Sequence, residues 1–218
     1  MIEKEIKRDV FKSFLLAGAN YKGIYEFPEI KPTYTIPNRV IKFSKAVSRK
    51  TNDFNQWVHF FEKDDQFERI WNNPRQYLAR LKKFNGVILP DFSLYRNLPL
   101  AWQLWNILRS RMIGNWLQSN GVNVIPNIRF GDYRTYRCCC DGISKGCVIA
   151  VGSHGTMKHK RDREIFVKGF EYVMERLQPR AIIIYGTYPK ELLSEYAQTK
   201  IQIIVIESEY ATSHKEVV

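Results

Sequence analysis

The sequence predicts an α/β fold with a mainly parallel sheet, built from alternating strand–helix units. Two observations support this. Short apolar runs such as 181–185 and 201–206 are continuous instead of alternating, which indicates strands covered on both faces. Segments with helical spacing separate these runs, as expected for right-handed crossovers between parallel strands. At 218 residues the chain is shorter than the ~250 typical of a complete (β/α)₈ barrel. We therefore expect a partial or irregular barrel-like arrangement, with an open twisted sheet as the alternative.

The elements follow in order along the chain. An amphipathic helix is predicted over residues 3–17, and a proline-bearing extended arm with a short strand at 39–43 follows it. Together, residues 1 to about 55 would flank a single α/β domain that spans 1–218. Further strands are predicted at 57–61, 87–90, 122–128, 147–151, 181–185 and 201–206, and helices near 66–81 and at 98–119, 162–177 and 189–198.

The helix over 98–119 carries aromatic side chains, among them Trp102, Trp105 and Trp116. Their helical spacing favours a buried stripe over a row that stacks on nucleic-acid bases. His59 shares one face of its strand with Trp57 and Phe61, which predicts a core histidine.

The charge of the chain is strongly positive and uneven. The formal net charge is +12, and residues 1–180 hold 31 basic and 17 acidic groups. Such an excess favours binding to polyanionic partners. The alternative is that the basic side chains form an ordinary solvated surface. The longest apolar runs are far below the ~20 residues of a membrane span, and no secretion signal is visible, so we expect a cytoplasmic protein without membrane contact.

Four cysteines lie close together: Cys138, Cys139, Cys140 and Cys147. Three in a row does not match the spacing of two to four residues between paired zinc ligands, so we predict buried thiols and no metal site. No motif in the sequence identifies a cofactor.

In parallel sheets, ligands gather where the strands end. Two carboxylates, Asp91 and Asp132, follow strands within a segment, 86–150, that holds only three acidic residues against seven basic ones. We predict catalytic roles for both carboxylates, and we predict that Arg129 and Arg134 bind the substrate or its phosphate. The alternative is that Asp91 caps a turn, and that Asp132 caps a helix or pairs with either arginine.

A glycine-bearing turn follows the strand at 147–151. Gly152, Ser153, Gly155, Thr156 and Lys158 have the composition of a phosphate cradle, although the P-loop spacing is missing. His154 within this turn is the candidate for proton transfer. Tyr185 and Glu207, at the ends of the last two strands, complete the predicted site. The alternative is a flexible turn with a solvated histidine.

Several segments resemble a family of bacterial, phage and mobile-element proteins, the domain of unknown function family numbered 4417. The resemblance covers roughly residues 30–208, and its most specific parts are PDFSLY at 90–95 and IPNIRFGD at 125–132. It implies a mobile-element context without a catalytic assignment.

Three functions remain open at this point. The first is a phage-type protein that binds or processes nucleic acid, with a phosphate or nucleotide site at the strand ends. The second is a small-molecule enzyme that acts on a phosphorylated or nucleotide ligand in a barrel-like pocket, and the third is a protein-binding antagonist of host defence. Whether the protein is an enzyme, and its oligomeric state, stay undetermined.

Overall fold

A computed structural model describes residues 9–153, 156–188, 192, 194, 196 and 199–207. Its larger strands are β3 (Val40–Lys42), β4 (Trp57–His59), β5 (Gly86–Ile88), β6 (Val124–Ile125), β7 (Val148–Gly152), β8 (Ala181–Tyr185) and β9 (Gln202–Ile206). Its α-helices are α1 (Phe43–Ala46), α2 (Asp64–Asn72), α3 (Pro74–Leu81), α4 (Leu100–Ser119), α5 (Tyr133–Cys139) and α6 (Lys160–Leu177). A 3-10 helix, η1 (Ser13–Leu16), and an antiparallel pair, β1 (Tyr21–Lys22) and β2 (Phe27–Pro28), precede them.

The larger strands form two parallel sheets, ordered β3-β4-β5-β6 and β7-β8-β9. A parallel bridge between Asn127 and Ala150 joins the two sheets just beyond β6. There the Ile128 N–H donates to the Ala150 carbonyl (2.8 Å), and the Ala150 N–H donates to the Pro126 carbonyl (2.9 Å). The predicted α/β class with a parallel sheet is confirmed, and the described strands form no closed barrel.

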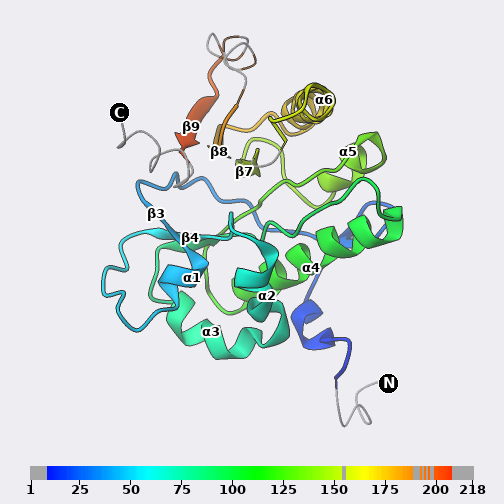
Figure 1. Ribbon diagram of the computed structural model, residues 1–218. Coiled ribbons are helices and arrows are strands. Elements are labelled where there is room, and N and C mark those ends of the chain that lie inside the picture. The colour runs from blue at the N-terminus through cyan, green and yellow to red at the C-terminus, as the bar shows by residue number, and fades with distance from the viewer. Residues whose placement is uncertain are drawn as a thin grey trace.

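Strand order follows chain order within each sheet, so right-handed crossovers put the helices on one face. Side chains from both sheets meet on the other face in one buried cluster that includes Trp57, Ile88, Ile125, Ala150 and Ile183. The strands therefore curve around their own apolar side chains, which gives the molecule its open, barrel-like character. Figure 1 shows α1, α2 and α3 near β3 and β4, with α5 and α6 toward the end that holds β7 to β9.

The predicted N-terminal helix over 3–17 is wrong in its described part. Only Ser13–Leu16 is helical, and as a 3-10 turn. Lys12 has φ 56°, in the left-handed region that interrupts a right-handed helix, and the Asp9 carboxylate accepts the N–H groups of Ser13 and Phe14. The helix predicted at 189–198 lies largely outside the described residues.

Helix α4 buries polar side chains against the loops at the strand ends. Asn106 donates to the Ser93 carbonyl (2.7 Å), and Ser110 donates to the Pro90 carbonyl (2.9 Å). Arg111, 1% exposed, donates to the Cys139 carbonyl (2.7 Å), and burial lowers the pKa of its guanidinium. Because the carbonyls of these loops and of the last turn of α5 have no sheet partner, these side chains satisfy them and fix both segments in place.

The helices that the structure describes include none that is long and apolar enough to cross a membrane.

Candidate functional site

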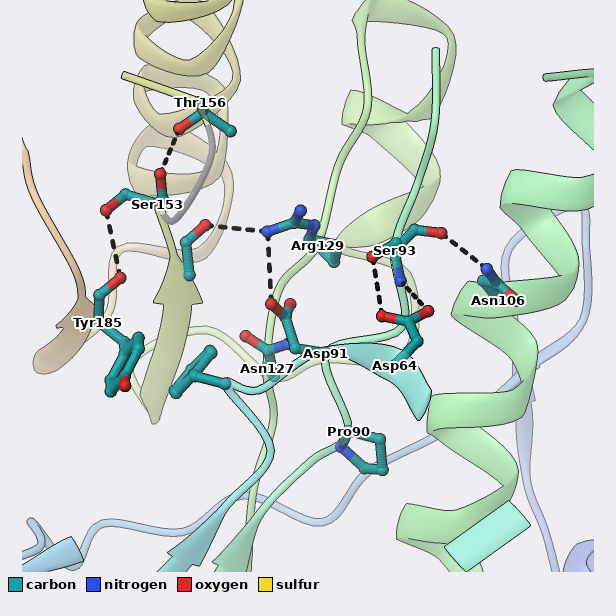
Figure 2. Close-up of polar contacts among 12 residues, drawn as sticks. Asp64, Pro90, Asp91, Ser93, Asn106, Asn127, Arg129, Ser153, Thr156 and Tyr185 are labelled. Carbon is teal, nitrogen blue, oxygen red and sulfur yellow. Dashed lines mark hydrogen bonds and ion pairs between the residues drawn. The ribbon is translucent and has the colours of Figure 1, made fainter. Parts of the chain in front are cut away.

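Asp91 lies at the centre of the edge where the strands end. Its Oδ1 accepts a hydrogen bond from Asn127 Nδ2 (2.7 Å), and its Oδ2 pairs with Arg129 Nη1 (3.4 Å), as Figure 2 shows. The same Nη1 donates to the Gly152 carbonyl at the end of β7 (3.2 Å). Asp91 and Arg129 thus connect the loops that follow β5 and β6 to the last residue of β7.

Gly152 is required at this edge for close packing. A Cβ atom there would lie 2.9 Å from Asp91 Oδ2 and 3.0 Å from the Phe61 ring. The next residue, Ser153, is 1% exposed, and its hydroxyl donates to the Tyr185 carbonyl (3.2 Å). The structure therefore gives both residues a packing role, beside the anion-binding role that the sequence suggests for them.

Other polar side chains at the strand ends hold neighbouring loops together. Glu62, after β4, accepts hydrogen bonds from the N–H and hydroxyl of Ser44. Asp64 accepts from the N–H (3.1 Å) and hydroxyl (2.8 Å) of Ser93, in the loop after β5 (Figure 2). Each strand end is thus tied to the next across the first sheet, which makes this edge rigid.

Asp132 caps helix α5. Its carboxylate accepts the Arg134 N–H (3.1 Å), and Thr135 completes a capping box. It also pairs with the Arg134 guanidinium (2.8 Å), and this hydrogen-bonded pair lowers the pKa of the Asp132 carboxyl. Asp132 therefore has the geometry of a helix cap paired with an arginine, which is the alternative to a catalytic role.

The remaining predicted residues are spread along the same edge. Thr156 donates to the Ser153 carbonyl (2.7 Å), and Lys158 is exposed just before α6. Tyr185 is 5% exposed, and its ring stacks on Phe61 with centroids 4.7 Å apart. Glu207 is exposed after β9. His154 and Gly155 lie outside the described residues.

A cavity of about 610 Å³ opens at this edge, between the loops after β5 and β6 and the start of α6. Three arginines line this strand-end cavity: Arg96, Arg129 and Arg161. One carboxylate, Asp162, also lines it and pairs with Arg96. Of the predicted site residues, Arg129 and Thr156 line the cavity, whereas Asp132 and Arg134 do not. The cavity carries excess positive charge and suits an anion.

Arg96 and Arg161 are the lining cations that the predicted site omits. Arg161 belongs to a basic run over 158–163 that is visible in the sequence, but a run of charge does not distinguish a site from a solvated helix start. Arg96 follows the PDFSLY segment, and nothing in its local sequence marks it.

All four cysteines are buried, and burial raises the pKa of Cys138 and Cys147 to about 11. Within the described ranges, no three histidine, cysteine, aspartate or glutamate side chains gather in a way that could hold a metal ion.

Comparison with known proteins places the chain in a sequence family. Residues 19–208 match the family described as Domain of unknown function (DUF4417). The chain is 37% identical over 163 residues to the Gene 1 protein of Mycobacterium phage L5, covering 74% of this chain and 71% of the relative. It is 34% identical over 163 residues to the Gene 1 protein of Mycobacterium phage D29, covering 74% and 60%. No solved structure matches. The chain therefore belongs to the DUF4417 family and is similar to these two phage proteins.

Proposed function

We propose that this protein binds the phosphate backbone of nucleic acid at the strand-end cavity. The observation that carries the proposal is the convergence of Arg96, Arg129 and Arg161 on one cavity from three separate segments of the chain. Guanidinium groups recognise phosphate through paired N–H donors, so three of them around one hollow suit a phosphodiester.

The surroundings of Arg129 support this role. Its guanidinium is held on one side by Asp91 and by the Gly152 carbonyl, which fixes its direction before any ligand arrives. A fixed donor loses less side-chain entropy when a ligand binds. The net charge of +12 adds a long-range attraction for polyanions.

Arg161 is the residue to test, because it is exposed and its loss disturbs little of the fold. Each phosphate contact on a single strand releases about 0.7 counterion, so Arg161→Gln should weaken binding about five-fold near 0.1 M salt. The measurement is fluorescence anisotropy with a labelled single-stranded oligonucleotide. Lys82→Gln is the matched control, because Lys82 is exposed at the opposite edge, beside Trp57 and Asn123.

Two results would contradict the proposal. One is the absence of binding by the unmodified protein at micromolar concentration in low salt. The other is an equal loss in Arg161→Gln and Lys82→Gln, which would show that only overall charge matters.

The volume of the cavity supports a second candidate, a free nucleotide, since small-molecule sites commonly span about 300–1,000 Å³. A competition experiment between a mononucleotide and an oligonucleotide distinguishes the two candidate functions. A mononucleotide that binds in the absence of any oligonucleotide affinity would favour the small-molecule function.

A further inference from the structure

A second hollow, of about 540 Å³, is lined in part by helix α5, through Arg134, Arg137 and Cys138. Its lining carries five basic side chains, Lys22, Arg134, Arg137, Lys145 and Arg176, against two acidic ones, Glu29 and Asp141. We call it the basic hollow. The predicted site includes only one of its residues, Arg134.

Most of these cations are available to a ligand. Arg137, Lys145 and Arg176 are exposed, and within the described part of the chain their side chains make no hydrogen bond or ion pair. Burial raises the pKa of the Asp141 carboxyl, which Arg137 and Arg176 affect only at longer range. The basic hollow therefore holds uncompensated positive charge.

The basic hollow and the strand-end cavity are joined by a direct contact. Arg134 lines the basic hollow, and its Nη2 donates to the carbonyl of Arg96, which lines the strand-end cavity (3.0 Å). Helix α5 lies beside α6 (Figure 1), and the Tyr136 hydroxyl donates to the Ile165 carbonyl (2.7 Å). The Arg96–Arg134 contact, at the start of α5, thus links the linings of the two hollows.

Exposed tyrosines accompany the arginines along this path. Tyr95 lines the strand-end cavity and is 60% exposed, and Tyr133, at the start of α5, is 79% exposed. Tyr25 lines the basic hollow and is 38% exposed. Exposed aromatic rings among cations are the arrangement by which proteins hold single strands, because unpaired bases stack on the rings while the cations follow the phosphates.

We propose that a single strand of nucleic acid runs from the strand-end cavity across Tyr133 into the basic hollow. This inference rests on the proposed function and specifies its substrate class. A duplex keeps its bases stacked on one another, so it cannot use Tyr95, Tyr133 and Tyr25 in this way.

The test compares labelled thymidine oligonucleotides of about 4 and about 20 nucleotides, chosen to span part or all of such a path. In the double variant Arg137→Gln, Arg176→Gln, affinity for the long oligonucleotide should fall about 25-fold near 0.1 M salt, and its salt slope should decrease by about 1.4. Affinity for the short one should change less than two-fold. The control is the double variant Lys50→Gln, Lys82→Gln, which removes the same charge from exposed positions elsewhere.

Variants of Tyr133 measure the contribution of base stacking to binding separately from the contribution of charge. Tyr133→Ala should weaken binding of the long oligonucleotide at least five-fold, whereas Tyr133→Phe should retain it, because the ring and not the hydroxyl makes the stack. Circular dichroism of each variant checks that α5 remains folded.

The inference is overturned if the Arg137, Arg176 variant binds the long oligonucleotide as tightly as the control does, or if a duplex of equal length binds as well as the single strand. Should Arg161→Gln still weaken binding in that case, the strand-end cavity alone is the site, and the proposed function survives. If Arg161→Gln has no effect either, both proposals fail.

Discussion

Replacing Asp91 with alanine should lower the free energy of unfolding by about 2–3 kcal/mol, with a fall in Tm of about 4–12 °C. The carboxylate is 11% exposed and has two partners, Asn127 and the 20% exposed Arg129. Its removal leaves a largely buried guanidinium without its counter-ion and a buried amide without its acceptor, and both losses destabilise the folded state. Thermal denaturation followed by circular dichroism measures the change.

Asp132 provides the matched control. Asp132→Ala removes a helix cap and should cost about 1 kcal/mol, while Asp132→Asn keeps a good cap and should cost less. The pKa of Asp132 is lowered in the folded protein, so its pairing with Arg134 stabilises the fold at neutral pH and is lost as the pH falls below about 4. An unchanged Tm for Asp91→Ala would contradict the organising role of Asp91 and would favour the catalytic role that the sequence suggests.

The central strands β7 and β8 were predictable because burial on both faces leaves a continuous apolar signature. Strand β9, at the end of its sheet, is only half-buried although its sequence is also apolar. The run at 181–185 coincides with β8, and the runs at 147–151 and 201–206 overlap β7 and β9. Parallel strands end on the same side, so topology alone also brought Asp91 and Arg129 near Gly152. The proximity of these three residues could therefore be predicted without knowing how the side chains pack.

In helix α4, the spacing of the apolar residues does not correctly predict which side chains are buried. Trp102 and Trp105, predicted as part of a buried stripe, are 58% and 43% exposed, although Trp116 is buried as predicted. The buried surface of α4 carries polar residues instead, such as Asn106 and Arg111, because a strand-end loop and the end of helix α5 present carbonyl groups to it that need donors. A pattern of apolar spacing contains no information about those carbonyls.

Helix α5 was predicted only as the alternative in which Asp132 caps a helix, and Arg96 and Arg161 of the cavity lining were missed. Helix α5 consists of seven residues that end in cysteines, and its capping residue, Asp132, carries the same sequence signal as a catalytic carboxylate. The contact between Arg96 and Arg134 joins a loop to a helix residue 38 positions away in the chain. Such a contact depends on the tertiary fold, so no local sequence pattern predicts it.

Binding of single-stranded DNA should be steeply salt-dependent. If about five of the cations along the two hollows contact phosphates, the slope of log K against log salt is about −3.5, and affinity falls about 100-fold between 50 and 200 mM salt. Anisotropy titrations at four or more salt concentrations give the slope. A slope near zero together with measurable affinity would exclude a phosphate-directed site and would favour a ligand held by other contacts.

Locating the bound strand on the protein tests the proposed site most directly. Ultraviolet crosslinking of a bound thymidine oligonucleotide, followed by mass spectrometry of the digested complex, identifies the residues that stack on bases. We expect crosslinks at Tyr95 and Tyr133. The opposite edge offers its own exposed aromatic residue, Tyr34, which is 54% exposed and directly precedes Thr35 and Ile36 in the hollow that Lys82 also lines. Crosslinks concentrated at that edge, with none at Tyr95 or Tyr133, would contradict a nucleic-acid site at the strand ends.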